Sequence, residues 1–301
     1  MLLDLDARQD SRFAQMVARD RVVRPAWSVL VPFFNEQAFL ARTIESLGAQ
    51  SRAARIILID NGSTDDSAGI ARATCDRLGL DYLLITEARP GKVQALKAGL
   101  RWVRTQYVAT CDADTFYPAG YLAAAEALLE QDGCVVAGAY FVSEHANTET
   151  RLKAGAKMCA TARMLPRQCH TGGAGQAFRA DVLRRAGGFD ADLWGYVLED
   201  HEVIHRMMKQ GTMRYSEDLW CAPSPRERDR ASIRWTLVER LMYSALAPWA
   251  GDWFFYDFLA SRLRSRRLIS QSIRERQFQG AAYAGQDTGR MMGAATNPVC
   301  G

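Results

Sequence analysis

Residues 107–118 read YVATCDADTFYP, an apolar, β-favouring run that ends in two carboxylates one residue apart. Residues i and i+2 of a strand point to the same side, so Asp112 and Asp114 would share one face. Two anions on one face repel each other unless a cation lies between them. The pair therefore either points into water, as a solvated Asp-x-Asp turn commonly does, or holds a metal.

Three further apolar runs precede this one along the chain. They are WSVLVPFF (27–34), IILID (56–60) and YLLIT (82–86). Between them, apolar residues recur at helical spacing. Continuous apolar strands that alternate with helices predict an α/β protein, with a mostly parallel sheet flanked by helices on both faces. Ligands bind at the carboxyl ends of such strands. Polar residues follow the first two strands there as well: Asn35, Glu36, Asp60 and Asn61.

The second half of the chain is less regular. We expect a strand over 134–140, a helix over about 149–165, a glycine-rich loop, HTGGAGQAF, over 170–178, and a helix over 198–211 that ends at Gly211. No internal repeat or low-complexity tract interrupts these elements.

Composition excludes several classes of protein. The 301 residues are 48% hydrophobic, enough for one large or two small domains, and a net charge of +4 is too small to indicate nucleic-acid binding. The seven cysteines form no CxxC pair, so no disulfide framework or structural zinc site is indicated. Scattered thiols favour a reducing compartment. With no signal-peptide pattern and no apolar stretch of 18 residues, a cytoplasmic protein is expected.

The carboxylates and one lysine match what a bound diphosphate needs. Mg²⁺ and Mn²⁺ prefer oxygen ligands and often keep only one or two protein carboxylates, with phosphate oxygens completing the shell. Lys92 in RPGKVQALKAGL (89–100) lies at a predicted helix start, where free N–H groups and the helix dipole favour an anion. An ordinary surface lysine is the competing interpretation, and the P-loop pattern is absent.

Six segments occur in a characteristic order: VPFFNE, IDNGSTDDS, PGKVQALKAGL, CDADTFYP, GGAGQAFRADVLRRAGGFD and LEDHEVIHRMMKQG. In that order and spacing they resemble the family 2 glycosyltransferases, which have the GT-A fold, over about residues 27–235. The resemblance implies an inverting, metal-assisted enzyme with Mn²⁺ or Mg²⁺ as cofactor. It would move a sugar from a nucleotide-diphosphate donor, a UDP-sugar by default, to a hydroxyl of a saccharide or lipid-linked acceptor.

The resemblance also implies roles for residues at matching positions. Asp112 and Asp114 resemble the DxD motif, which binds the donor's ribose and the metal. Asp60 stands where the family has an acid that contacts the base, whereas Asn61 replaces the second aspartate often found there and could still pair with a base edge. The implied donor site is Pro32, Asn35, Glu36, Asp60, Asn61, Lys92, Asp112, Ala113 and Asp114. Asp200 matches the family's catalytic base, with Glu199 beside it.

The chemistry of sugar transfer explains these residue types. The departing diphosphate gains negative charge, which a divalent metal and a lysine stabilise. The acceptor hydroxyl loses its proton as it attacks, and a carboxylate can take that proton. Asp200 near a helix N-terminus would stay ionised because of the dipole. One base without a covalent nucleophile implies inversion. The competing interpretation of Glu199 and Asp200 is helix capping.

Acceptor contacts are expected from three residues. Gly172 and Gly173 permit close approach of a substrate to the backbone, or simply make a tight turn. Trp194 either stacks on an acceptor sugar or belongs to the core. His201 and His205 have metal-compatible spacing on one helix, but no third ligand is evident, so ordinary surface or core histidines are favoured.

The C-terminal third is basic and aromatic. Residues 226–235, RERDRASIRW, place Arg226, Arg228 and Arg234 in a loop expected to close over the donor diphosphate. The Q/R-x-x-R-W motif of processive synthases is broken there at Ala231. Residues 241–267 suit a segment at a membrane surface, peripheral on the inner face, or a helical pair packed on the core or on a second subunit.

The expected organisation has four parts. They are an N-terminal extension (1–25), a GT-A domain (26–235), a helical aromatic and arginine-rich segment (236–279) and a poorly ordered tail (280–301).

Two other functions stay open. A sugar-1-phosphate nucleotidyltransferase shares the nucleotide-binding half, but it usually has a glycine-rich strand-to-helix signature that VPFFNE does not match. A non-catalytic nucleotide-sugar-binding or scaffold protein on the same fold is expected to have lost Asp112, Asp114 or Asp200, and all three are present.

Overall fold

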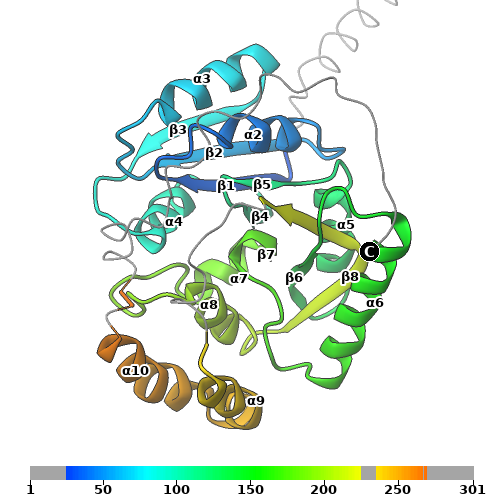
Figure 1. Ribbon diagram of the computed structural model, residues 1–301, viewed down its shortest axis with the longest axis vertical. Helices are drawn as coiled ribbons and strands as arrows, with labels where there is room; N and C mark the ends of the chain where they lie inside the picture. The colour runs from blue at the N-terminus through cyan, green and yellow to red at the C-terminus, as the bar shows by residue number, and fades with distance from the viewer. Residues whose placement is uncertain (1–24, 225–234, 267, 270–301) are drawn as a thin grey trace, which may run out of the picture.

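A computed structural model describes residues 25–224, 235–266 and 268–269, and these form the predicted α/β architecture (Figure 1). Within these ranges eight strands lie in the order β3-β2-β1-β4-β7-β6-β8-β5. The strands are β1 (Trp27–Phe33), β2 (Ala54–Asp60), β3 (Tyr82–Thr86), β4 (Tyr107–Thr110), β5 (Thr115–Phe116), β6 (Cys134–Phe141), β7 (Gln176–Arg179) and β8 (Thr212–Pro223).

The helices cover both faces of this sheet. They are α2 (Leu40–Gly48), α3 (Ser67–Leu78), α4 (Lys92–Leu100), α5 (Tyr121–Leu129), α6 (Thr148–Met164), α7 (Ala180–Arg185), α8 (Glu199–Met207), α9 (Leu237–Asp252) and α10 (Ala260–Ser265), with a 3₁₀ turn η1 (Gly173–Gly175) and a π-helical turn η3 (Trp253–Leu259). In β1, Val29 and Val31 point into a core shared with α2, α3 and α5, whereas Leu30 points into a core shared with α4, α7 and α8. This alternation is the period of two that a strand imposes.

The central strands are parallel, as predicted: β2 and β4 both pair in parallel with β1, and β3 pairs in parallel with β2. Their carboxyl ends therefore lie at one edge of the sheet, which gathers the polar residues that follow them. The sheet as a whole is mixed, because β7 runs antiparallel between β4 and β6.

Three strands were not predicted, one of them the two-residue β5. The expected loop 170–178 gives way to β7 at Gln176, and residues 212–223 form the long strand β8. Residues 216–218 are polar and resemble a turn in the sequence, so β8 was not recognised as a strand. In the structure these residues lie at a register shift between β6 and β8, where Gly138 pairs with Tyr215 and Tyr140 pairs with Trp220. A bulge of this kind accommodates residues that do not pair.

The C-terminal helices pack on the domain below α8 (Figure 1). Phe254, Phe255 and Leu259 of η3 are fully buried in a third core. The segment therefore packs on the core, which is one of the two alternatives expected from the sequence. Contact of the segment with a membrane stays a prediction. None of the helices in the described ranges has the length and apolarity to span a bilayer.

A buried ion pair joins α9 to α10. Glu239 is 0% exposed. Its carboxylate lies 3.0 Å from Arg262 Nε and 2.8 Å from Arg266 Nη2, and it accepts a hydrogen bond from the Thr236 N–H. Burial alone would raise the pKa of Glu239, but the Thr236 N–H and the two arginines hold it below its ordinary value.

Replacing this carboxylate tests the packing of the C-terminal helices. We expect Glu239→Ala to lower the free energy of unfolding by about 3 kcal/mol, because it leaves arginine charges facing a buried site. The control is Glu149→Ala, which removes an exposed pair with Lys153 and should cost at most about 0.5 kcal/mol. Urea unfolding measures both. Equal effects of the two substitutions would show that Glu239 does not hold the helices together.

Candidate active site

The loops after β1 and β2 are tied to each other by hydrogen bonds. Asn35 Oδ1 accepts from the Thr64 N–H at 2.8 Å, and the Glu36 N–H donates to Ser67 Oγ at 2.8 Å. Asp60 Oδ1 accepts from the Ser63 N–H at 2.8 Å. The structure therefore brings together the predicted nucleotide-site residues of these two loops.

Asn61, predicted to contact a base, is bonded to the protein backbone in the structure. Its side chain is buried, and its Nδ2 donates to the carbonyl oxygens of Glu87 and Arg89, both at 2.8 Å. Its Oδ1 accepts from the Gly91 N–H at 3.0 Å. Both amide hydrogens are thus already used by protein backbone. Gly91 has φ 120°, which only glycine adopts readily, so Asn61 fixes the turn that delivers Lys92.

Lys92 begins α4 and points at two carboxylates. Its Nζ lies 2.6 Å from Asp112 Oδ1 and 3.8 Å from Glu199 Oε1. Burial alone would lower the pKa of Lys92, but Asp112 and Glu199 raise it above its ordinary value, so the ammonium stays charged. The charged ammonium of Lys92 therefore lies at the edge of the sheet where the parallel strands end.

The Asp112–Asp114 segment is held firmly by its backbone. The Asp112 N–H donates to the Tyr117 hydroxyl at 2.9 Å, Thr43 Oγ1 donates to the Ala113 carbonyl at 2.9 Å, and the Asp114 carbonyl accepts from the Ser224 N–H. Asp114 is buried, whereas the Asp112 side chain is 26% exposed. A rigid acidic loop of this kind can present its carboxylates without reorganisation.

This donor set fits a hard divalent cation that shares its shell with phosphate. In the described ranges no three His, Cys, Asp or Glu side chains gather to form a metal site by themselves. Two neighbouring carboxylates are what Mg²⁺ or Mn²⁺ commonly keeps when nucleotide oxygens supply the remaining ligands. Asp112 and Asp114 are the residues that would hold the ion.

Asp200 lies in the first turn of α8, held on both oxygens. Its Oδ2 accepts from the Gly173 N–H at 2.9 Å. Its Oδ1 accepts from the His201 backbone N–H at 2.8 Å and from His201 Nδ1 at 2.9 Å. Leu198, the residue that precedes α8, has φ 65°, a strained conformation for a branched residue. Strain of this sort is retained where surrounding contacts over-determine a functional turn.

The pKa values of the adjacent carboxyl groups of Glu199 and Asp200 are shifted in opposite directions. Burial raises the pKa of Glu199, and Lys92 only partly opposes the rise. Burial also works against ionisation of Asp200, but His201 and then Lys92 hold the pKa of Asp200 below its ordinary value. Carboxylates whose pKa values are driven apart mark acid and base roles, and the one whose pKa is lowered, as suits a base, is Asp200.

The glycines of the 170–178 segment make room beside these groups. A Cβ at Gly172 would lie 3.5 Å from Asp200 Oδ2, and a Cβ at Gly173 would lie 3.3 Å from Lys92 Nζ. A side chain at Gly173 would therefore press on Lys92 and Asp200, and one at Gly172 would press on Phe141 and Asp200. Thr110 Oγ1 donates to the Gly173 carbonyl at 2.6 Å and fixes this approach.

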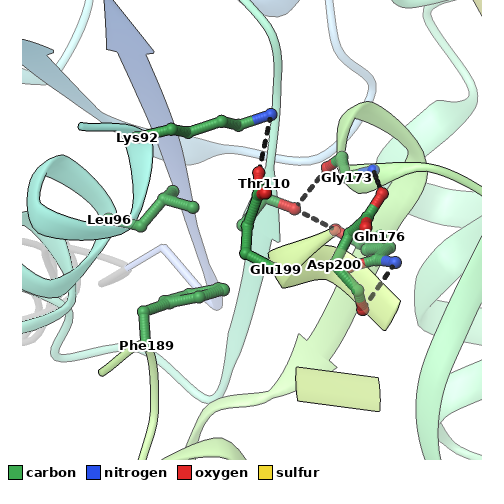
Figure 2. Close-up of a pocket in the computed structure, with 8 residues that line it drawn as sticks. All are labelled: Lys92, Leu96, Thr110, Gly173, Gln176, Phe189, Glu199 and Asp200. Atoms are coloured by element: carbon green, nitrogen blue, oxygen red, sulfur yellow. Dashed lines mark hydrogen bonds and ion pairs between the residues drawn. The ribbon is translucent and has the colours of Figure 1, made fainter. Parts of the chain in front are cut away.

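Figure 2 shows Lys92 reaching toward Glu199 from one side of a small pocket, with Gly173 and Asp200 on the other. The lining residues are Lys92, Leu96, Thr110, Gly173, Gln176, Phe189, Glu199 and Asp200. Thr110 and Gln176 were not predicted. Gln176 Nε2 donates to the Asp200 carbonyl at 3.4 Å, and its place in the quoted glycine-rich motif was the available signal.

Several predicted residues lie elsewhere. Trp194 is 1% exposed, its Nε1 donates to the Val197 carbonyl, and its ring packs on Phe255, so the core alternative describes it and stacking on a sugar does not. His205 bonds Asp252, as an ordinary structural histidine does. Arg226, Arg228 and Arg234 lie outside the described residues.

Comparison with known proteins gives one family. A model described as "Glycosyl transferase family 2" matches residues 28–184. Succinoglycan biosynthesis protein ExoU of Rhizobium meliloti (strain 1021) is 33% identical over 105 residues, which are 35% of this chain and 30% of that protein. The uncharacterised glycosyltransferase YaiP of Escherichia coli (strain K12) is 26% identical over 241 residues, 71% of this chain and 59% of that one. The chain thus spans less than two thirds of either relative.

Among solved structures, the mannosyltransferase PcManGT from Pyrobaculum calidifontis, in complex with GDP-Man and Mn²⁺, has a TM-score of 0.60 and 22% identity. The match covers 80% of this chain and 69% of that one. At this identity the likeness concerns the fold, and it confirms the predicted GT-A architecture.

Proposed function

Because the chain belongs to glycosyl transferase family 2, we propose that it transfers a sugar from a nucleotide-diphosphate sugar to a hydroxyl of a saccharide acceptor, with inversion at the anomeric carbon. One observation carries this proposal. A charged lysine and a partly buried aspartate, whose pKa is held low, face one pocket at the carboxyl ends of the parallel strands. These are the electrostatic clamp and the general base that sugar transfer requires.

In the proposed reaction Asp200 takes the proton of the acceptor hydroxyl as its oxygen attacks the anomeric carbon. Lys92 lies close enough to the acidic loop to stabilise the charge that develops on the departing diphosphate. Asp112 and Asp114 would hold a divalent cation, which supplies Lewis-acid stabilisation of the same charge when bound. Gly172 and Gly173 leave the space through which the acceptor reaches Asp200.

We place the nucleotide over the loops after β1 and β2, with Asn35, Glu36 and Asp60 among its contacts and Pro32 in the strand that leads to them. We propose that the donor is a uridine diphosphate sugar, so that the bound base is uracil. The backbone of this region is cross-linked by the Asn35 and Glu36 hydrogen bonds, so it provides a preformed surface. Such a surface lowers the entropic cost of binding.

A lipid-linked saccharide is the second candidate acceptor. Exposed apolar side chains recur along α9 at Leu237, Leu241 and Trp249, whereas its buried residues face the domain. Leu237 and Leu241, four residues apart, lie near one another on the helix surface, and Trp249 follows eight residues later. This observation supports a contact with lipid, and it does not change the proposed chemistry of the pocket.

Turnover of nucleotide sugars tests the proposed function. The full chain is incubated with UDP-, GDP- and dTDP-sugars and Mn²⁺, and release of nucleoside diphosphate is followed with and without saccharide acceptors. We expect release from one donor, faster with an acceptor and abolished by EDTA. Tight binding of a nucleotide sugar without any release or transfer would contradict the enzyme proposal and favour the scaffold alternative. Release of pyrophosphate from a nucleoside triphosphate and a sugar 1-phosphate would instead identify a nucleotidyltransferase.

A further inference from the structure

His201 was expected to be an ordinary histidine, but its ring contacts the proposed base. Its Nδ1 lies 2.9 Å from Asp200 Oδ1. An ionised carboxylate can only accept hydrogen bonds, so Nδ1 must be the protonated ring nitrogen. The ring is enclosed edge-on by Trp235 and Tyr243, at centroid distances of 5.2 and 6.0 Å. Trp235 and Tyr243 therefore pack against His201, and His201 in turn hydrogen-bonds Asp200.

The two oxygens of Asp200 are not equivalent. Each carboxylate oxygen offers about two acceptor positions. Oδ1 receives both the backbone N–H and the Nδ1–H of His201. Among the described residues, Oδ2 receives the single N–H of Gly173. One acceptor position thus remains on Oδ2, the oxygen nearest the space that Gly172 leaves open.

We propose that His201 is the positioning residue for Asp200, saturating Oδ1 so that Oδ2 is the oxygen that takes the acceptor's proton. This inference rests on the proposed function of the pocket. In the step, the hydroxyl proton moves to Oδ2 while the acceptor oxygen forms its bond to the anomeric carbon. The bond from that carbon to the diphosphate breaks, and its electron pair leaves with the diphosphate.

The geometry distinguishes amide replacements of the histidine. The side-chain nitrogen of Asn takes a place close to Nδ1 of His, whereas that of Gln takes a place close to Nε2. His201→Asn should therefore keep the hydrogen bond to Oδ1, and His201→Gln and His201→Phe should lose it. The matched control is His205→Asn, since His205 lies one turn further along the same helix and bonds Asp252 instead of Asp200.

Kinetics should separate positioning from mere stability. We expect His201→Phe and His201→Gln to lower kcat about 10- to 100-fold with donor KM unchanged, the size of a lost hydrogen bond to a charged group. The acid limb of the kcat profile should move to higher pH, because a bond that favours ionised Asp200 is gone. His201→Asn should stay within about threefold of the parent, well inside the value of that bond. Equal losses in the Asn and Gln variants would overturn the proposal.

The charged and titratable groups that surround Asp200 bear on that profile. They come from α4, α8, α9 and the segment before η1, and they are Lys92, Glu199, His201, Tyr243 and Cys169, with His170 facing His201. None of the His201 variants changes the other five groups, so a shift of the acid limb that appears with Gln and Phe but not with Asn reports the Nδ1 bond.

A measurement without substrate separates this inference from the proposed function. The chain has four histidines, so ¹⁵N spectra of the imidazoles can be assigned with the His201→Asn variant. Above the pH at which His201 becomes neutral, we expect its proton on Nδ1, and we expect Asp200→Asn to weaken that preference. A neutral His201 protonated on Nε2 would overturn the proposal. If neutral His201 carries its proton on Nδ1 but the chain transfers sugar from no donor, the proposed function is wrong and the positioning of Asp200 by His201 still holds.

Discussion

Asp200→Asn is expected to lower kcat for sugar transfer by about 10²- to 10⁴-fold, the range that general base catalysis supplies. The amide is isosteric, and its single oxygen can keep one of the two sets of hydrogen bonds that Asp200 accepts, either from Gly173 or from His201. The lost property is the capacity to take a proton. Donor affinity, measured by calorimetry with the nucleoside diphosphate and Mn²⁺, should change little.

The control is Asp192→Asn, because the Asp192 side chain is 92% exposed and lies 3.7 Å from Lys97, away from the pocket. It should retain full activity. Normal turnover by Asp200→Asn would remove this residue from the base role. A loss of donor binding that matches the loss of turnover would assign Asp200 to the donor site instead.

Asp112→Asn is expected to lower kcat/KM at least about 100-fold, because Lewis-acid stabilisation of a departing group is worth several kcal/mol. The substitution removes a negative charge and also releases Lys92, whose Nζ lies 2.6 Å from Asp112 Oδ1. Metal-dependent donor binding should weaken, while nucleotide binding in EDTA should stay the same. Calorimetric titration with and without Mn²⁺ measures this difference.

Asp81→Asn provides the matched control, since Asp81 is an exposed acid at 3.7 Å from Arg55. It should leave the metal dependence unchanged. If Asp112→Asn binds the nucleotide as tightly as the parent does, with the same response to Mn²⁺, then the acidic pair does not hold a metal against the diphosphate.

The sequence allowed the parallel half of the fold to be predicted because its strands are buried on both faces. The continuous apolar run WSVLVPFF, for example, coincides with the buried strand β1 (Trp27–Phe33). The mixed half was harder. β8 contains exposed polar residues where it bulges away from β6, so its local pattern resembles a turn. Pairing with a distant strand, which the sequence does not display, is what makes it a strand.

The site shows the same division. Lys92, Asp112 and Asp200 could be found because their chemical types stand at strand ends and helix starts. The burial of the Asn61 side chain and of the Trp194 ring could not be predicted from the sequence, because burial at a loop depends on what packs over it. His201 was undervalued because its partner is the neighbouring residue, Asp200, and only the ring orientation reveals the bond.

The most direct test of the account is the thermal unfolding midpoint of the full chain with uridine, guanosine, cytidine, thymidine and adenosine diphosphates, each with Mn²⁺ and with EDTA. A ligand that binds the native state at 100 times its Kd stabilises it by about 2.7 kcal/mol. We predict a rise in the midpoint with uridine diphosphate that disappears in EDTA. No rise with any nucleotide would contradict a metal-assisted donor site at Asp112 and Asp114.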